Sequence, residues 1–398
     1  MKKLGYIIGV VGALVLMISV GCVEKFEADI SGLVTEGLVV EGDIISDSTV
    51  VFTLSKTLPL NMTDENKDLF DDYMNVDADL TVKGSDGSSW PGFWWGRGRY
   101  RVEIGTLKPE VEYYLEIVYN GDTYQSEPQK PLLASGIESV TFSQPNLEGP
   151  VRIQLNTQES DMAEAKYYLW YFEEDWEVRA HYHSQDLYEP WLDRIVHYDY
   201  PPVAQGWCYN GTDQIIVGTT ESNVDNRIVG KTIQTIECTD HRLSFLYSIR
   251  IQQRNLTRKE YEYYQVRAKQ NSDMGGLFTP QPSELPTNIV CSDPTRKVIG
   301  YVGCNMGIAT RQLYISRQEV SYRDGYTCDV GKVPDGSNLE KYVAGFQVCM
   351  KEENMVEWAR IGCVDVRNKH ADPQGRPRWW PNPYLYYKEE PDMGGLGD

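Results

Sequence analysis

Residues 113–126 read YYLEIVYNGDTYQS, and they carry the strongest fold signal in the chain. Apolar and aromatic side chains stand at every second position from Tyr113 to Tyr119, which is the period of a strand that buries one face. Asn120-Gly121 follows directly, and this pair favours a two-residue hairpin turn because both residues tolerate a positive φ. The stretch therefore predicts two antiparallel strands, the second beginning near Thr123-Tyr124.

Other strand-like stretches precede this hairpin at short intervals, and no long helical pattern separates them. They are Leu38–Ile44, Val50–Ser55, Ala78–Val82 and Tyr100–Ile104. Short strands at regular spacing are typical of a β-sandwich. Residues 37–135 are therefore expected to form a sandwich of immunoglobulin or fibronectin type.

A larger β-rich domain is expected over residues 136–366. Strand patterns recur in it, for example at Ile137–Phe142 and Val151–Leu155. Residues 173–210 are dense in aromatic and acidic side chains and are expected to form an insertion. Residues 367–398 are rich in Pro and Gly and are expected to form a tail.

One helix is expected within this domain, at about residues 258–271. Thr257 and Glu260 have the spacing of a capping box, in which each side chain binds the backbone N–H of the other residue. Tyr261, Tyr264 and Ala268 then fall on one helical face. The predicted fold class is mainly β, with an N-terminal sandwich, a larger β-rich domain and one notable helix.

The N-terminus has the layout of a lipoprotein signal peptide. Residues 1–21 combine a basic start with an apolar run, and small residues lead up to Cys22. Cys22 is therefore the predicted lipidation site, and residues 22–36 a tether. A transmembrane anchor is the alternative, but the apolar run is near the lower limit for a span and is followed by acidic residues. The lipoprotein reading predicts a soluble body held on a bacterial membrane by acyl chains.

The charge balance restricts the partners of the chain. Its 58 acidic residues outnumber its 38 Lys and Arg residues, for a formal net charge of −20. Such a chain repels polyanions, so nucleic acid and anionic lipid surfaces are poor partners.

Aromatic residues are abundant, with 27 Tyr and 10 Trp. Strand-rich proteins use many aromatics in their cores, but clustered aromatics also form binding surfaces. A hairpin tip folded onto the sandwich is the alternative for the first of three clusters. The candidate binding residues are Trp90, Phe93, Trp94 and Trp95; Trp176, Tyr188, Trp191 and Trp207; and Trp379 and Trp380.

Seven cysteines follow residue 200, and export would allow them to oxidise. An odd number permits at most three disulfides among them, and the sequence leaves the pairing open. The absence of a CxxC motif argues against a zinc ribbon or a thioredoxin-type site. The disulfide candidates are Cys208, Cys238, Cys291, Cys304, Cys328, Cys349 and Cys363.

Signals for catalysis are weak. His181 and His183 would share one face of a strand and are the best metal candidates, although zinc would need a further ligand. Glu173, Glu174 and Asp175 offer carboxylates, but the sequence does not show the separation that a glycosidase pair requires. No HExxH, GxSxG or phosphate-binding loop occurs, so the chain is expected to be no enzyme and to carry no cofactor.

The order of several short motifs resembles a known lipoprotein family. Cys22 is followed by Leu38-Val39-Val40-Glu41-Gly42 and by Thr53-Leu54-Ser55-Lys56. Later come Tyr124-Gln125-Ser126, Gly275-Gly276-Leu277-Phe278 and Val298-Ile299-Gly300-Tyr301. In this order the motifs resemble the lipoproteins of Bacteroidota called domain of unknown function 4249, over most of residues 22–316.

This resemblance implies a setting rather than a chemistry. Such proteins are similar in setting to surface lipoproteins that accompany TonB-dependent receptors, which are β-barrels of the outer membrane. Glu24, Glu27 and Asp29 also resemble the acidic signals that send Bacteroidota lipoproteins to the cell surface. The resemblance thus implies a lipid-anchored protein of the outer membrane that faces outward and helps a receptor to capture or take up a nutrient.

Two other functions stay open from the sequence. One is a structural or assembly accessory of an outer-membrane complex that has no small ligand. The other is a metal-dependent surface hydrolase built around His181 and His183.

Overall fold

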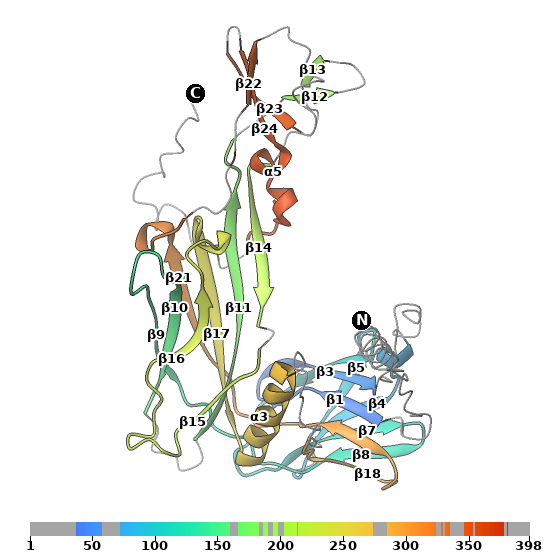
Figure 1. Ribbon diagram of the computed structural model, residues 1–398. Helices are drawn as coiled ribbons and strands as arrows, with labels where there is room; N and C mark the ends of the chain where they lie inside the picture. The colour runs from blue at the N-terminus through green and yellow to red at the C-terminus, as the bar shows by residue number, and fades with distance from the viewer. Residues whose placement is uncertain are drawn as a thin grey trace, which may run out of the picture.

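The computed structural model is mainly β, as predicted, and consists of two sandwiches and a small distal cap (Figure 1). Within the described part of the chain, no helix has the length and apolar character needed to cross a membrane. The predicted signal peptide at 1–21, Cys22 and the tether at 22–36 lie outside the described residues. The structure describes residues 37–57, 72–159, 166–182, 186–189, 194–197, 203–212, 214–273, 285–323, 328, 331–334, 346–352, 355–377 and 380.

The first sandwich is built from one strip of nine strands that folds over on itself, in the order β18-β8-β7-β4-β5-β6-β3-β1-β19. Both layers contribute to a single core, for example through Phe52 and Val102 from one layer and Val82 and Leu115 from the other. The strands are β1 (Gly37–Glu41), β3 (Ser48–Lys56), β4 (Asp79–Gly84), β5 (Ser89–Trp94), β6 (Arg99–Ile104), β7 (Tyr113–Tyr119), β8 (Asp122–Ser126), β18 (Ile289–Cys291) and β19 (Lys297–Gly300).

Strand β5 forms the corner between the two layers. Its first half pairs with β4, where Pro91 lies opposite Thr81, and its second half pairs with β6, where Gly92 lies opposite Val102. A Cβ atom at Gly92 would lie 2.9 Å from Cδ2 of Leu80, so a larger residue would crowd this corner. The Pro-Gly pair therefore suits the point where the strand leaves one layer for the other.

The hairpin of β7 and β8 is confirmed. Tyr119 pairs with Asp122, which leaves a two-residue turn. Asn120 and Gly121 adopt φ values of 52° and 85°, the left-handed conformation that the Asn-Gly pair predicts.

The first sandwich extends beyond the predicted boundary at residue 135. Strand β18 pairs with β8 and strand β19 pairs in parallel with β1, although both follow the second sandwich in the sequence. A further pair of short strands also links the N-terminal residues to the returning part of the chain. These strands are β2 (Ile44–Ile45) and β20 (Cys304–Asn305). Residues 37–135 are therefore an incomplete unit, because the chain returns to finish their sheets.

The second sandwich packs a three-stranded sheet against a five-stranded one. Ile153 and Leu155 of the smaller sheet share a core with Trp170, Ile249 and Ile251 of the larger sheet. The smaller sheet contains β9 (Ile137–Ser143), β10 (Val151–Thr157) and β16 (Lys231–Ile236), and the larger sheet contains β11 (Tyr167–Arg179), β14 (Gln205–Gly211), β15 (Ile216–Thr219), β17 (Leu246–Leu256) and β21 (Ala309–Ser316).

The insertion predicted at 173–210 is wrong at both ends. Residues 173–179 continue the long strand β11, and residues 205–211 form its neighbour β14. Their acidic residues look like surface in the sequence, but Glu174 and Glu177 are buried and paired with polar partners. Because these side chains are charged, the sequence does not show that they belong to a central strand of the second sandwich.

A small cap lies at the end of β11 that is far from the first sandwich (Figure 1). We define the cap as β22 (Gly331–Pro334), β23 (Phe346–Glu352), β24 (Met355–Arg360) and α5 (Ile361–Val364), beside a hairpin of β12 (Asp186–Glu189) and β13 (Arg194–His197). The start of the predicted tail packs below it, because Asp372 pairs with Trp207 of β14 and Ala371 is buried.

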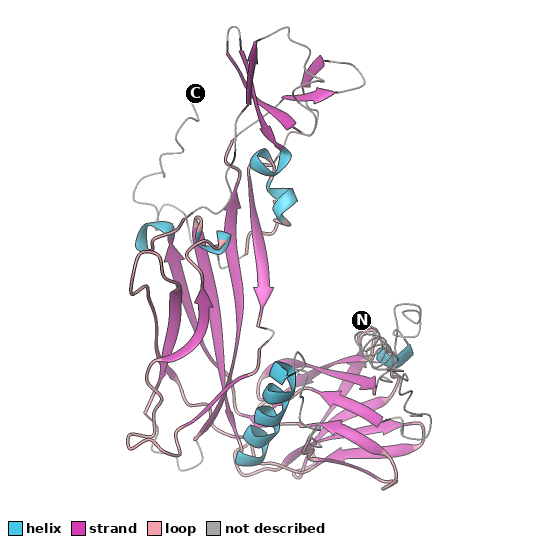
Figure 2. Cartoon of the chain, in the orientation of Figure 1, coloured by secondary structure: helices cyan, strands magenta, loops and turns pink. Residues whose placement is uncertain are grey.

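The helix α3 (Arg258–Asp273) lies in the angle between the two sandwiches (Figure 2). Its capping box is confirmed: the N–H of Glu260 donates to Oγ1 of Thr257 over 3.2 Å, and the N–H of Thr257 to Oε2 of Glu260 over 3.4 Å. The helix packs with Tyr261 and Tyr264 against Leu169 and Leu256 of the larger sheet.

A buried arginine joins the two sandwiches beside this helix. Nη1 of Arg254, on β17, lies 2.8 Å from Oδ1 of Asp43 in the first sandwich and 2.8 Å from Oε1 of Glu260. Nη1 also donates to Oδ1 of Asn305 over 3.3 Å, and Nη2 donates to the hydroxyl of Tyr264 over 3.1 Å. Arg254 and Glu260 are each 1% exposed, so these charges depend on one another rather than on water.

Replacing Arg254 should separate the buried charges from their partner. We expect Arg254→Met to lower the free energy of unfolding by about 3–5 kcal/mol, because Asp43 and Glu260 lose their counter-ion. Urea unfolding followed by tryptophan fluorescence measures this change. The control is Arg258→Met, whose exposed pair with Glu262 should be worth about 0.5 kcal/mol or less. Equal effects of the two substitutions would contradict a stabilising role for the junction.

Candidate binding surface

Three consecutive aromatic side chains stand exposed at the end of β5. Phe93 is 61% exposed, Trp94 45% and Trp95 60%. Large aromatic side chains are usually at least half-buried, and adjoining exposed ones commonly mark a contact site. We call Phe93, Trp94 and Trp95 the aromatic surface.

The corner in β5 explains why this cluster divides into a buried part and an exposed part. Before the corner, Trp90 is half-buried and packs on Tyr113 with 5.9 Å between ring centroids. After the corner, the strand pairs with β6. Trp90 therefore packs against the core, whereas Phe93, Trp94 and Trp95 are exposed. Phe93 lies opposite the exposed Arg101 and Trp94 opposite the buried Tyr100, so these two rings leave the hairpin on opposite faces.

The exposed rings are held in place by their neighbours. Trp94 meets Tyr100 edge to face at 5.3 Å, and the guanidinium of Arg99 lies 5.0 Å from the centre of the Trp95 ring. The turn that follows is tight, because a Cβ at Gly98 would lie 2.0 Å from the carbonyl oxygen of Leu54. The aromatic surface therefore rests on a firmly built hairpin.

Basic residues border the aromatic surface. Arg97, Arg99 and Arg101 are exposed on the returning side of this hairpin, and Phe93 lies directly opposite Arg101. Arg101 makes an ion pair of 3.1 Å with Glu103. In a chain of net charge −20, this hairpin combines aromatic and cationic groups, which is the composition of protein-binding hot spots.

The other predicted aromatic residues do not join this surface. The prediction that Trp176 and Trp380 are contact residues is wrong, because both side chains are buried. Trp176 faces the core of the second sandwich and lies beside His241. Trp207 is half-buried on β14. Trp191, Trp379 and the side chain of Tyr188 lie outside what the structure describes.

The metal candidate is only partly within the described residues. His181 is exposed, and its backbone N–H donates to the carbonyl of Cys363 over 2.9 Å. His183 lies outside the described residues. Among the residues that are described, no three His, Cys, Asp or Glu side chains gather as metal ligands.

The cysteines form one disulfide in the described part of the chain, between Cys328 and Cys363, whose Cα atoms are 5.9 Å apart. The backbone N–H groups of His181 and Tyr182 both donate to the carbonyl of Cys363, so these hydrogen bonds join α5 of the cap to the residues that follow β11. The remaining candidates divide as follows: Cys208, Cys238, Cys291 and Cys304 form no disulfide, and the side chain of Cys349 is not described.

The disulfide prediction is therefore wrong for these four thiols. Cys208 lies in the second core, whereas Cys291 and Cys304 lie in the first. Burial also raises the pKa of Cys304 to about 12, which keeps it protonated.

The carboxylates of β11 point to opposite faces of the sheet. Both oxygens of Glu174 lie 3.0 Å from Nη1 of Arg242, and the hydroxyl of Tyr247 donates to Oε2 over 2.6 Å. Asp175 faces the other way and is 5% exposed, and its Oδ2 atom accepts no hydrogen bond from the described residues. Because alternate residues of a strand face apart, Glu174 and Asp175 do not form an acid–base pair.

A comparison with known families adds to this geometry. Residues 23–306 match the profile of the family described as "Domain of unknown function (DUF4249)". The chain belongs to this family. The DUF4249 match ends just after β20, so it includes all strands of the first sandwich, the returning ones among them, and most of the second.

The chain was also compared with curated protein sequences and with solved structures. No curated protein sequence matches the chain significantly. Among solved structures, a segment of two fibronectin type III domains from chicken tenascin is similar over 56% of this chain and 93% of that chain, at 12% identity and a TM-score of 0.14.

The buried carboxyl of Asp175 makes the stability of this DUF4249 protein depend on pH. Burial, and then the charge of Glu173, raise the pKa of Asp175 from 3.8 to about 7, and Arg250 opposes them. A raised pKa in the folded state means that the contribution of Asp175 to stability is complete below about pH 4 and is lost as the pH rises to about 7.

We therefore expect Asp175→Asn to stabilise the protein at pH 8 by about 1–2 kcal/mol, and this gain should disappear near pH 4. Urea unfolding at pH 4, 6 and 8 measures it. The matched control is Glu174→Gln, which should destabilise by about 2 kcal/mol at pH 8 because Arg242 and Tyr247 lose a charged partner. A variant Asp175→Asn that is less stable than the wild type at pH 8 would contradict this account.

Proposed function

We propose that the protein is a lipid-anchored, non-enzymatic protein of the bacterial outer membrane that faces outward and partners a TonB-dependent receptor in nutrient capture or uptake. Three features support the proposal. Residues 1–22 have the layout of a lipoprotein signal ending in Cys22, and the chain is a member of the DUF4249 family. The aromatic surface supplies a place for a protein partner.

The aromatic surface is the observation on which the proposal depends. Transfer of apolar surface out of water gains roughly 25 cal/mol per Å², so three exposed aromatic rings favour association. Trp and Arg are also enriched among residues that dominate binding energy at interfaces. The arginines lie on the returning strand beside Phe93 and Trp95, so a partner with an acidic rim around an apolar patch would match them.

The position of the surface suits an anchored protein. The tether predicted at 22–36 can span at most about 50 Å when fully extended, and it enters the first sandwich at Gly37. Strand β1 and the aromatic strand β5 belong to the same strip and are separated by β3 and β6. The aromatic surface therefore stays within reach of a barrel in the same membrane.

Substitutions in the aromatic surface should abolish binding to the receptor. We expect the triple variant Phe93→Ser, Trp94→Ser and Trp95→Ser to lose co-purification with an outer-membrane barrel, because it lacks the apolar contact. The full chain, tagged at its C-terminus, is purified from membranes in mild detergent, and mass spectrometry identifies what accompanies it.

The matched control replaces exposed apolar residues of the second sandwich, Leu147→Ser and Val224→Ser, which are 74% and 101% exposed in the unsubstituted chain. This control variant should still co-purify with the outer-membrane barrel. A wild-type protein that purifies alone, or a triple variant that retains the barrel, would overturn the proposal.

Growth of a deletion strain distinguishes this proposal from the assembly alternative. A receptor partner predicts a nutrient-specific growth defect, and an assembly accessory predicts a general envelope defect.

A further inference from the structure

One side of the first sandwich carries a row of exposed side chains that starts at the aromatic surface. Phe93 of β5 lies directly opposite Arg101 of β6, and Arg101 lies directly opposite Val51 of β3. Side chains that lie opposite one another in an antiparallel pair are neighbours on the same face. All three are exposed, so the row places a cation between two apolar groups on three adjacent strands. We call this side of the first sandwich the outer face.

A second row lies beside the first on the outer face. Arg99 precedes Arg101 by two positions on β6, and alternate residues of a strand share a face. Arg99 lies opposite Thr53 of β3, which in turn lies opposite Glu41 of β1. Glu41 forms an ion pair with Arg267 of α3. The outer face is therefore bounded by the aromatic surface at one side and by the helix at the other.

Arg99 is held in one orientation but has no counter-ion. Its Nε atom donates to the carbonyl oxygen of Gly96 over 3.3 Å, and its guanidinium lies 5.0 Å from the centre of the Trp95 ring. Within the described part of the chain, no carboxylate pairs with Arg99 and its Nη atoms make no hydrogen bond. A guanidinium placed in this way presents its outer N–H groups to a carboxylate without reorientation.

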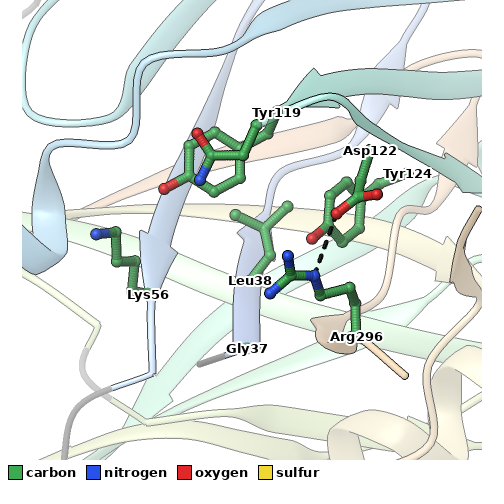
Figure 3. Close-up of a pocket in the computed structure, with 8 residues that line it drawn as sticks. Gly37, Leu38, Lys56, Tyr119, Asp122, Tyr124 and Arg296 are labelled. Atoms are coloured by element: carbon green, nitrogen blue, oxygen red, sulfur yellow. Dashed lines mark hydrogen bonds and ion pairs between the residues drawn. The ribbon is translucent and has the colours of Figure 1, made fainter. Parts of the chain in front are cut away.

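The small pocket at the start of β1 shows the opposite situation. There Nε of Arg296 donates to Oδ2 of Asp122 over 3.1 Å and lies 3.8 Å from Oδ2 of Asp293. Figure 3 shows the contact between Arg296 and Asp122, and it shows the ammonium of Lys56 directed away from that guanidinium. The charge of Arg296 is thus already compensated within the chain, unlike that of Arg99.

Arg101 is also accessible to a partner. Its ion pair with Glu103 joins two side chains that are 52% and 67% exposed, and ion pairs between exposed side chains are weak. A carboxylate from a partner can therefore replace Glu103. Arg99 and Arg101 stand about 7 Å apart along β6, which is also the spacing of alternate residues in an extended chain.

We propose that the outer face binds an extended segment of the partner protein in which every second residue is acidic. The carboxylates of this segment contact Arg99 and Arg101, as charge-assisted hydrogen bonds favour. Phe93 and Trp95 pack against the segment from one side and Val51 from the other. This inference deepens the proposed function, on which it rests for the identity of the partner as a receptor.

Charge favours a short acidic segment over an extended anionic surface. The net charge of −20 repels a membrane or a polyanion that faces the whole chain. Screening over about 8 Å at physiological ionic strength limits what a short segment senses to the groups close to it. On the outer face those groups are Arg99 and Arg101, which the carboxylates of the segment can contact directly.

Binding of an acidic segment can be measured without the receptor. A fluorescein-labelled peptide of alternating Glu and Thr is titrated with the full chain in uncharged detergent, and its fluorescence anisotropy is recorded. We expect saturable binding, and we expect the double variant Arg99→Gln with Arg101→Gln to weaken it at least about tenfold. The matched control is Arg152→Gln, which removes an exposed arginine of β10 and should bind as the wild type does.

A second double variant, Arg99→Lys with Arg101→Lys, distinguishes loss of charge from loss of structure. It keeps both charges and should bind the peptide within about threefold of the wild type. No binding of the acidic peptide by the wild type, equal binding of a peptide of alternating Lys and Thr, or full binding by the Gln variant would overturn the proposal. Sedimentation with phosphatidylglycerol vesicles that requires the two arginines, without peptide binding, would overturn it in favour of a lipid surface.

This inference and the receptor proposal fail separately. If the Gln variant keeps the outer-membrane barrel while the aromatic triple variant loses it, the receptor proposal stands and the acidic segment is wrong. If the wild type purifies without a barrel but binds the acidic peptide through Arg99 and Arg101, the outer face binds such a segment and the receptor proposal is wrong.

Discussion

The arrangement of the molecule depends on the buried positive charge of Arg254. Asp43 reaches it from the first sandwich, Glu260 from the start of α3, and Asn305 from the returning strand β20. Removal of a guanidinium from water costs several kcal/mol unless its donors are met, so Arg254 stays buried only while all three segments surround it. The same contact therefore fixes the helix, the returning strand and the angle between the two sandwiches.

The path of the chain strengthens this junction. The polypeptide leaves the first sandwich after β8, returns at β18 and leaves again after β20 to form β21. Gln253 and Asn255, on either side of Arg254, bind the connecting residue Ser135, so the polar contacts extend into the first crossing. A single connection would permit a hinge, whereas several crossings tied to one buried charge hold the cap away from the aromatic surface.

Local features of the fold could be predicted from the sequence, and non-local ones could not. The Asn120-Gly121 turn and the Thr257–Glu260 capping box involve neighbours in the chain, and both formed as expected. Strands β18 and β19 are too short to show a period, and their partners lie far away in the sequence. Only the second half of β11, residues 173–179, falls in the predicted insertion, because Glu174 and Glu177 look like surface residues although hydrogen bonds satisfy them inside. At the candidate binding surface, the sequence identifies the aromatic cluster but not its division at Pro91-Gly92, which depends on the pairing of β5 with two different strands.

The corner at Pro91-Gly92 shows why composition alone could not divide the aromatic residues. Trp90 lies on the core side of the corner, and Phe93 to Trp95 lie beyond it, so neighbours of identical chemistry have opposite environments. The exposed rings are also ordered: Tyr100 supports Trp94, and Arg99 covers Trp95. An aromatic side chain that is already immobilised loses little conformational entropy on binding. A surface that is apolar, bordered by arginines and ordered in advance favours one complementary partner over indiscriminate adhesion, as the proposed docking on a receptor would require.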